Sequence, residues 1–398
     1  MHPAHEIRCT KSSALKGKRI VLGITGSIAA VETIKLAREL TRHGAEVYPV
    51  MSKAAQEIIH PYSIHFACGF EPITQLTGKV EHVAICGEVQ DRADMLLIAP
   101  ATANTISKIA MGIDDTPVTT FATTAIGSGI KVSLAPAMHA SMYKHPVVME
   151  NLEKLKSMGI EVIMPKMEEK KAKLASNPEI VNHVLRSLGK ASLKGRKVLV
   201  IGGAGYEPLD DFRIITNKSS GETAAALAQE AYFRGADVRL IMGSHDVELP
   251  SQIERFGTLD ELKELIKDGD ADIILVPAAL PDFKSKNRTQ GKIPSTSPIT
   301  LELEPTRKMV DSLAGKGFLV MFKAEAGVAK EELEKRAFKS MRDSRANMIV
   351  ANDVLQVKSG ITEVSIITGS KTAHFKGTKT NAAIAIWNSI EDALHDPK

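Results

Sequence analysis

The chain of 398 residues has only three cysteines and few aromatic residues. Cys9, Cys68 and Cys86 form no Cys-x-x-Cys pair and are odd in number, which argues against a disulfide framework and a cysteine-rich zinc site. This cysteine usage suits a reducing compartment. Aromatic residues make up 4% of the sequence, which leaves little for stacking platforms.

The sequence also lacks long apolar runs and a strong excess of one charge. No stretch approaches about eighteen consecutive apolar residues, and residues 1–10 contain no apolar signal core, so we expect neither a membrane span nor a secretory signal. The net charge is +4 with acidic and basic residues mixed throughout, which argues against a dedicated nucleic-acid binder. We therefore expect a cytoplasmic protein without nucleic-acid or membrane partners.

What the chain does contain is a repeated approach to a glycine-rich turn. Residues 15–26 and 193–203 each lead from a basic turn through a short β-branched run into glycines, and helical spacing follows. A parallel strand enters a phosphate-binding turn in this way. With 43% apolar residues, the chain is long enough for two cores. We predict an α/β protein with two tandem Rossmann-like domains, at residues 15–189 and 193–398.

The first half predicts strands whose carboxyl ends lie at one edge of a sheet. Strands at residues 20–24 and 46–51 are each followed by helical spacing; Gly26 and Ser27 precede the first helix, and Ser52 precedes the second. Backbone N–H groups and hydroxyls at these positions can face a phosphate. For Gly26 and Ser27, a close-packed turn explains the residues equally well, and for Ser52 taken alone an ordinary N-cap explains it better.

Two further strands, at residues 94–99 and 131–134, each end in Ala-Pro-Ala. Small side chains at a strand end allow a flat ring to approach the backbone, which a larger residue would block. Each motif taken alone also fits an ordinary strand end.

His82 lies at the start of the helix predicted before residue 94. A histidine there can act as an acid, a base or an anion partner. A partly exposed polar residue without a catalytic role explains the position as well.

The second half repeats the alternation of strands and helices. It predicts strands at residues 198–201, 237–242 and 272–276, a hairpin over residues 363–375 and a closing helix over residues 380–394. Ser219 or Ser220 is expected to open the helix after the first of these strands. The basic stretch 284–294 follows a strand end, where it is either a solvated loop or a mobile lid over a triphosphate.

Several separated motifs in the same order resemble a known family. Residues 23–30, His82, residues 99–104 and residues 135–138 resemble the flavin-containing cysteine decarboxylases. Residues 202–208, Arg213 and residues 217–221 resemble the phosphopantothenate-cysteine ligases. The pair in this order is similar to the bifunctional coenzyme A biosynthesis proteins over nearly the whole chain.

For the first half, the resemblance implies a flavodoxin-like domain that binds FMN and decarboxylates 4'-phosphopantothenoylcysteine to 4'-phosphopantetheine. It implies FMN contacts from Gly26, Ser27, Ser52, Pro100, Ala101, Thr102, Ala103, Asn104 and Met138, and catalytic roles for His82 and His139. His139 stands where the bacterial members carry asparagine. Ser176 stands in the apparent place of the family's flap cysteine, and the sequence does not say which group replaces that thiol.

For the second half, the resemblance implies ligation of cysteine to 4'-phosphopantothenate through an acyl-cytidylate made from CTP. It implies catalytic roles for Asn217 and Lys292, and substrate or nucleotide contacts from Arg213, Asp282, Lys292 and Phe322. Mg²⁺ or another divalent cation would neutralise the triphosphate, through ligands that the sequence does not identify. Decarboxylase relatives form trimers and ligase domains form dimers, so a homo-oligomer is expected.

Three alternatives stay open at this point. A tandem NAD enzyme would explain the glycines, although neither half has a clean Gly-x-Gly-x-x-Gly with an acidic residue about twenty positions on. A non-catalytic FMN-binding regulatory protein is the second alternative. The third is a ligase whose flavin half has decayed, which the absent flap cysteine favours.

Overall fold

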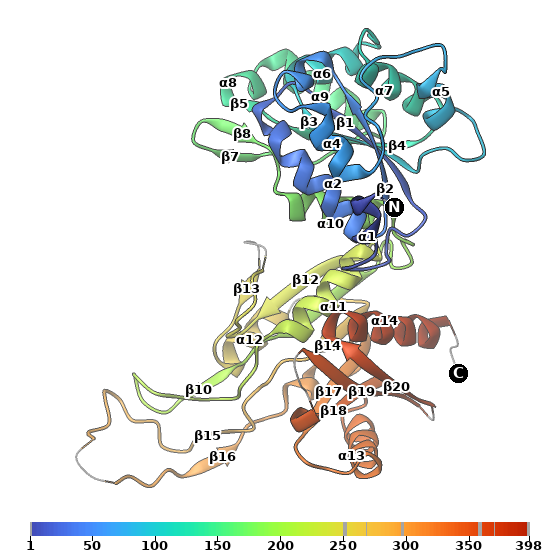
Figure 1. Cartoon of the computed structure of the whole chain (residues 1–398). Helices are drawn as coiled ribbons and strands as arrows, with labels where there is room; N and C mark the ends of the chain where they lie inside the picture. The colour runs from blue at the N-terminus through green and yellow to red at the C-terminus, as the bar shows by residue number, and fades with distance from the viewer. Residues whose placement is uncertain are drawn as a thin grey trace. The chain divides into compact units, whose positions relative to one another are not determined.

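The computed structural model describes residues 2–249, 253–267, 269–295, 298–356, 360–369 and 371–395. The chain divides into two compact units, one up to Gly189 and one from Lys190 onward, and each is described by itself (Figure 1). None of the described helices is long and apolar enough to cross a membrane.

The first unit is built on a parallel sheet that has five strands in the described residues, in the order β2-β1-β3-β4-β6. The strands are β1 (Arg19–Ile24), β2 (Glu46–Met51), β3 (Met95–Ala101), β4 (Lys131–Pro136) and β6 (Glu161–Val162). The neighbours pair in parallel throughout. This is the flavodoxin-like order, in which strand succession reverses between β1 and β3 and ligands bind beyond the strand ends there. The predicted fold class is confirmed.

Helices enclose this sheet. The described elements are α1 (Pro3–Glu6), η1 (Ile28–Glu32), α2 (Thr33–Arg42), α3 (Lys53–Gln56), α4 (Pro61–Cys68), α5 (Glu81–Cys86), α6 (Ala103–Ala110), α7 (Pro117–Gly127), α8 (Ala140–Tyr143), α9 (Pro146–Ser157) and α10 (Asn177–Leu188). Helices α6, α7 and α9 share one apolar cluster with the central strands. Helix α2 packs on α4 and α10 outside that cluster. A separate small sheet, β5 (Met138–His139), β8 (Lys171–Lys173) and β7 (Lys166–Glu168), was not predicted.

A polar cluster ties the edge strand β6 to β4 and α10. Glu161 accepts hydrogen bonds from His183 Nε2 at 2.8 Å, Ser187 Oγ at 3.0 Å and Ser133 Oγ at 3.1 Å. The hydrogen bond from His183 is the largest influence and outweighs partial burial, so the pKa of Glu161 falls from an ordinary 4.5 to about 2.

This depressed pKa predicts acid sensitivity of the first unit. Because the folded pKa lies below the unfolded one, the stabilisation is complete above about pH 4.5 and is lost as pH falls toward 2. The carboxylate is nearly half exposed, so we expect a contribution of at most about 1 kcal/mol. Glu161→Gln should have a lower melting temperature than the parent at neutral pH. Its melting temperature should fall less than that of the parent when the pH is lowered, as measured by circular dichroism. Equal acid dependence in both proteins would contradict the assignment.

The second unit is built on a sheet that has eight strands in its described residues, in the order β13-β12-β9-β14-β17-β18-β19-β20. The strands are β9 (Lys197–Gly202), β12 (Asp237–Met242), β13 (Glu254–Arg255), β14 (Ile273–Val276), β17 (Phe318–Glu325), β18 (Met348–Asp353), β19 (Ile361–Thr368) and β20 (Lys371–Thr378). The first six positions pair in parallel in the dinucleotide-fold order, and β19 and β20 extend the sheet antiparallel. The succession reverses between β9 and β14.

Helices cover both faces of this sheet. The described elements are α11 (Glu222–Phe233), α12 (Leu259–Ile266), η2 (Met309–Ser312), α13 (Lys330–Asp343), η3 (Val354–Gln356) and α14 (Lys379–His395). Helices α11 and α14 contribute to one apolar cluster, and α12 and α13 contribute to another. The prediction that Ser219 or Ser220 opens α11 is wrong. Gly221 is the N-cap. Its backbone has a φ of +78°, a left-handed conformation that glycine adopts without strain.

An arm extends from the second sheet (Figure 1). It comprises β10 (Tyr206–Pro208) with β11 (Ile214–Thr216), and β15 (Phe283–Ser285) with β16 (Leu303–Pro305). The basic stretch 284–294, predicted to be a solvated loop or a mobile lid, therefore begins within a strand. Its pairing partner lies about twenty residues downstream, beyond the reach of local sequence patterns.

Gly202, at the end of β9, allows α11 to pack against the sheet. A Cβ on this residue would overlap Ala224 Cβ and stand 2.8 Å from Met242 Sδ. We expect Gly202→Ala to destabilise the second unit by roughly 1 to 3 kcal/mol, as overpacking does.

This loss can be measured in the second unit alone, because the only tryptophan, Trp387, is buried there. Its Nε1 donates to Leu227 O at 2.9 Å, so its fluorescence in urea reports the α11–α14 contact. Gly127→Ala, which meets nothing within 4 Å, is the control and should leave that transition unchanged. An unchanged midpoint for Gly202→Ala would refute the packing argument.

Candidate functional site

In the first unit, Thr25 joins the ends of β1 and β3. Its hydroxyl donates to Pro100 O at 2.7 Å and accepts from Thr102 N at 3.1 Å, and the residue is buried. The two turns at the reversal point of the sheet are thus held together by one side chain. Thr25 was not among the predicted site residues; the available signal was a hydroxyl-bearing residue directly before Gly26.

Gly26, Ser27 and Ser52 lie at this edge of the sheet. A Cβ on Gly26 would stand 2.5 Å from Ala54 Cβ, so only glycine lets this turn approach the start of α3. The Ser27 hydroxyl accepts from Ala29 N at 3.4 Å, and that of Ser52 accepts from Ala55 N at 3.2 Å. Both serines are therefore N-caps. Their predicted contact with a phosphate stays a prediction.

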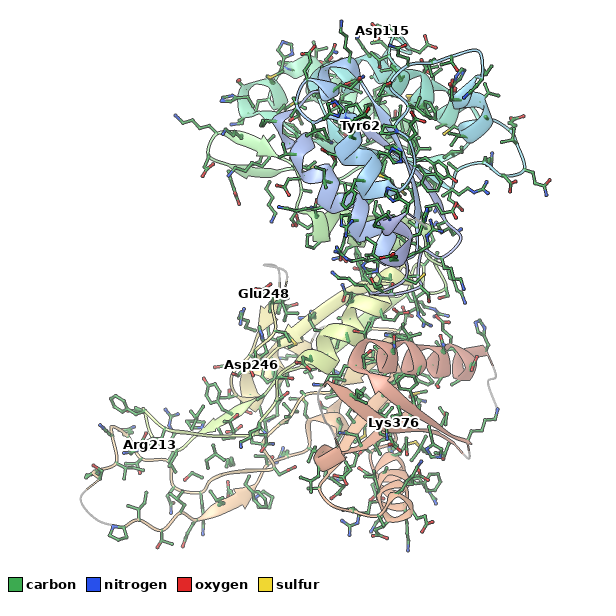
Figure 2. All side chains as sticks on the ribbon, in the orientation of Figure 1. Tyr62, Asp115, Arg213, Asp246, Glu248 and Lys376 are labelled. Carbon is green, nitrogen blue, oxygen red and sulfur yellow. The ribbon has the colours of Figure 1, made fainter. Side chains whose placement is uncertain are left out.

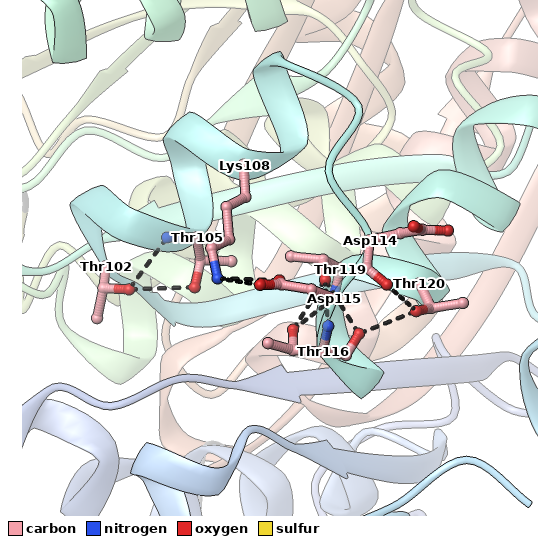
Figure 3. A network of polar contacts seen from close by, with 8 residues as sticks. All are labelled: Thr102, Thr105, Lys108, Asp114, Asp115, Thr116, Thr119 and Thr120. Atoms are coloured by element: carbon pink, nitrogen blue, oxygen red, sulfur yellow. Dashed lines mark hydrogen bonds and ion pairs between the residues drawn. The ribbon is translucent and has the colours of Figure 1, made fainter.

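Thr102, in the turn of residues 100–104, belongs to a group of polar contacts that continues along α6 to the start of α7 (Figure 3). Thr102 caps α6 by accepting from Thr105 N at 3.3 Å. One helical turn on, Lys108 forms an ion pair with Asp115 at 2.7 Å, next to the capping box that opens α7. In this turn Ala101 and Ala103 are buried and Asn104 is exposed. The turn therefore keeps its two alanine side chains inside the unit and leaves the Asn104 amide at the surface.

Met138 and His139 leave the main sheet after β4 and pair with β8. Ala137 N donates to Ala101 O at 3.1 Å, which places this segment beside the end of β3. His139 is exposed, and its Nδ1 lies 3.0 Å from Ser141 Oγ. Met138 and His139 thus lie near the turn that Thr25 holds.

Ser176 is the N-cap of α10. Its hydroxyl donates to Glu179 Oε2 at 2.7 Å, and its amide donates to the same oxygen at 2.8 Å. Burial raises the pKa of Cys68 and of Cys86 to about 12, so neither thiol is an acid of use near neutral pH.

His82 lies on α5, as predicted, and its ring meets Phe121 of α7 edge to face, with 6.4 Å between the centroids. Its Nδ1 is buried and, among the described residues, has no hydrogen-bond partner. An unpaired buried nitrogen costs free energy, so its presence calls for an explanation beyond folding. No hydrogen bond in the described residues joins His82 to the turns around Thr25.

In the second unit, two cavities flank the turn of residues 218–220. One of about 300 Å³ is lined by that turn, the first residues of α11, Ala279, Phe322, Asn352 and Lys379. The other, of about 490 Å³, is lined by the same turn together with Ala204, Asn217, Ser244 and Asp246. Both lie where the strand order reverses. Ala204 bridges to Ala279 in parallel, which ties the ends of β9 and β14.

Asn217 and Phe322 face these cavities, whereas Arg213 and Lys292 line neither. Asn217 Nδ2 donates to Leu280 O at 2.8 Å, which orients its amide. Arg213 lies on the arm, away from Asp246 (Figure 2), and pairs with Asp210 at 2.6 Å. Asp282 is exposed at the base of the arm.

No group of three or more His, Cys, Asp or Glu side chains that could hold a metal ion occurs within the described residues.

Comparisons with known proteins assign each unit to a family. Residues 8–189 match the Flavoprotein family, and residues 193–394 match the DNA/pantothenate metabolism flavoprotein C-terminal domain. The chain is 48% identical over 404 residues to the coenzyme A biosynthesis bifunctional protein CoaBC of Thermococcus kodakarensis, covering 99% of this chain and 100% of the relative. It is 36% identical over 403 residues to the protein of the same name from Methanocaldococcus jannaschii, covering 98% of each.

Solved structures resemble each unit separately. The C-terminal domain of CoaBC covers 52% of this chain and 100% of its own, with a TM-score of 0.43 and 27% identity. The peptidyl-cysteine decarboxylase EpiD covers 42% of this chain and 98% of its own, with a TM-score of 0.38 and 25% identity.

Proposed function

Because this chain belongs to the coenzyme A biosynthesis bifunctional protein family and is a bifunctional phosphopantothenoylcysteine decarboxylase and phosphopantothenate-cysteine ligase, we propose that its two units divide the reactions. Residues 15–189 would decarboxylate and residues 193–398 would ligate. Family membership excludes the tandem NAD enzyme and the non-catalytic flavin protein. The flavoprotein match over residues 8–189 argues against a decayed first half.

FMN is the proposed cofactor of the first unit, at the edge where β1 and β3 end. The support is the closeness that Gly26 permits, the N-terminal ends of η1 and α3, and the buried hydroxyl of Thr25 that holds the two turns. FMN, when bound, supplies a two-electron acceptor for the substrate thiol and returns the hydride after carbon dioxide leaves. The small residues 100–103 would admit the flat ring, with Asn104 and Met138 at its border.

The protein's own side chains would then orient the substrate and move protons. His82 is proposed to take or give the proton at the reacting carbon and sulfur, and exposed His139 to donate a hydrogen bond to the substrate carboxylate. The Ser176 hydroxyl is hydrogen-bonded to Glu179 and is a weak acid. We therefore propose that another group donates the proton needed in the final reduction step.

Thr25→Val is expected to weaken FMN binding about tenfold, because it removes two buried hydrogen bonds while keeping the shape of the side chain. Thr25→Ser keeps the hydroxyl and is the control, with an affinity near that of the parent. Both are measured by the fluorescence of FMN titrated with apoprotein. Parent-like affinity of Thr25→Val would show that the bridge between β1 and β3 does not shape the flavin site.

CTP is the proposed nucleotide of the second unit, in the cavity of about 300 Å³, with Phe322 against the base and the start of α11 at the phosphates. The carboxylate of 4'-phosphopantothenate attacks the α-phosphorus and pyrophosphate leaves. The cysteine amine then attacks the acyl carbon, loses a proton and displaces CMP. Mg²⁺ bound to the triphosphate would stabilise the charge on the leaving pyrophosphate.

The observation that carries this proposal is the pair of cavities on either side of residues 218–220, one for nucleotide and one for the acyl group. The test supplies 4'-phosphopantothenate, cysteine, Mg²⁺ and CTP to the FMN-loaded enzyme and follows pyrophosphate, carbon dioxide and 4'-phosphopantetheine. All three products are expected. Equal turnover with ATP would overturn CTP as the preferred nucleotide, and pyrophosphate without carbon dioxide would leave the second unit alone active.

We also propose that the protein is cytoplasmic and forms a homo-oligomer. The free cysteines support the first proposal, and the arm supports the second. Apolar side chains on the arm are strongly exposed: Phe212 (72%), Ile214 (51%), Phe283 (49%) and Leu303 (45%). Such a surface on an extended segment is typical of a subunit contact. Light scattering after size exclusion tests it, and a monomer would overturn it.

A further inference from the structure

The basic stretch 284–294, predicted to be either a solvated loop or a mobile lid, is hydrogen-bonded to the arm. Residues 288–293 bond to the turn between β10 and β11 at several points. Thr289 N donates to Leu209 O at 3.3 Å, and Asp211 N donates to Gly291 O at 3.2 Å. The stretch is therefore held in one position on the β10–β11 turn, and we call this position its seat.

Asp210 is the centre of this seat, and its side chain is fully buried. Its Oδ1 accepts from the amides of Phe212 at 2.8 Å and Arg213 at 2.6 Å. Its Oδ2 accepts from Arg213 Nη1 at 2.6 Å and from Ile293 N at 3.0 Å. Arg213 Nη1 donates in turn to Ile293 O at 3.0 Å. One carboxylate thus binds both the arginine and the residue after Lys292.

Asp211 holds the residue before Lys292. Its Oδ2 accepts from Gly291 N at 2.7 Å, and its Oδ1 pairs with Arg288 at 3.2 Å. The peptide groups on both sides of Lys292 are therefore fixed. The Lys292 side chain is exposed, and its Nζ lies 5.7 Å from the centroid of the Phe212 ring.

Asp210 stays charged in this seat. Burial opposes ionisation, but hydrogen bonds from the amides of Ile293, Phe212 and Arg213 outweigh it and lower the pKa of Asp210 to about 2. The anion balances Arg213, so the two form a hydrogen-bonded pair with a fixed geometry.

We propose that Asp210 is a positioning residue of the ligase reaction, which holds Arg213 and the backbone beside Lys292 in one frame. This inference rests on the proposed function of the second unit. It adds that Asp210, a carboxylate that is not proposed to contact substrate, determines the positions of the Arg213 and Lys292 side chains. When a lysine that must contact a reacting group is misplaced by roughly 1 Å, the reaction rate falls about 10²-fold.

The first test does not depend on activity. Asp210→Asn leaves one acceptor oxygen where the carboxylate has two. The amide can then accept from the backbone N–H groups of Phe212 and Arg213 or from Arg213 Nη1 and Ile293 N, but not from both sets, so residues 288–293 should detach from the turn between β10 and β11. Limited trypsin digestion read by mass spectrometry should cut after Arg288 and Lys292 about tenfold faster than in the parent. Asp260→Asn, at a side chain that is 91% exposed, is the matched control and should match the parent. Equal cleavage in Asp210→Asn and the parent would overturn the proposal.

The second test separates positioning from folding. Pyrophosphate release without cysteine measures the first step, and transfer from the acyl-nucleotide to cysteine measures the second. Lys292→Gln and Asp210→Asn should each slow the second step about 10²-fold, and the double variant should be no slower than Lys292→Gln alone. If Asp210 only stabilises the fold, the rate losses of the two single variants should multiply in the double variant. The unfolding transition reported by Trp387 fluorescence should then also move to a lower urea concentration.

The outcomes distinguish this inference from the proposed function. A parent enzyme that releases no pyrophosphate from CTP and 4'-phosphopantothenate would overturn the proposed function. A competent parent whose Lys292→Gln variant is slow while Asp210→Asn is unimpaired would overturn only the positioning role.

Discussion

His82→Asn is expected to lower decarboxylation of 4'-phosphopantothenoylcysteine roughly 10²- to 10⁴-fold, the range over which general acid–base groups act. The reason lies in the buried Nδ1, which no described residue satisfies. Keeping such an atom unpaired costs stability, and Asn has no ring nitrogen to carry a proton. FMN affinity should stay within about twofold of the parent, because most of the residues proposed to contact FMN lie on the turns that Thr25 joins, and no described hydrogen bond connects His82 to these turns.

The measurement is single-turnover formation of carbon dioxide and 4'-phosphopantetheine by the FMN-loaded enzyme. His145→Asn is the matched control, because His145 is exposed, makes no side-chain capping bond and precedes α9, where asparagine caps well. It should turn over at the parent rate. Carbon dioxide without the reduced product would place the role of His82 after decarboxylation, and parent-like turnover of His82→Asn would remove it from the mechanism.

The two sheets were predictable because buried parallel strands are continuous apolar runs. β1 and β9 are such runs, each followed by glycines and helical spacing, so their place at the start of each unit follows from local pattern. The edge at which the candidate residues gather follows too, since all parallel strands end on one side. The small sheet of β5, β7 and β8 escaped prediction, because its strands are two or three residues long and largely exposed.

The residues that hold the sites escaped prediction for a different reason. Thr25 matters because of Pro100 and Thr102, about seventy-five residues away, and no local pattern marks such a partner. Arg213 was predicted as a ligand contact, but the carboxylate that holds it also holds Ile293, eighty positions on. Sequence motifs indicate candidate groups for the chemistry, whereas long-range packing decides which other residues position these groups.

Asn217→Ala is expected to lower formation of 4'-phosphopantothenoylcysteine roughly 10²- to 10³-fold, as loss of a preorganised polar group does. The Asn217 amide is oriented by its bond to Leu280 O and faces the cavity of about 490 Å³ beside the proposed nucleotide site. This position is consistent with the proposal that Asn217 holds the acyl-nucleotide between the two steps. Asn381→Ala, at an exposed residue of α14, is the control and should ligate at the parent rate.

The ratio of products tells a holding role from a structural one. If Asn217 retains the acyl-nucleotide, its loss lets the intermediate escape and hydrolyse, and more than one pyrophosphate is released for each amide formed. If the Leu280 bond only stabilises the turn, pyrophosphate and amide fall together and the Trp387 transition in urea moves to lower denaturant. Because the first step needs the nucleotide cavity and the second needs both cavities, only an escape of the intermediate separates the two products.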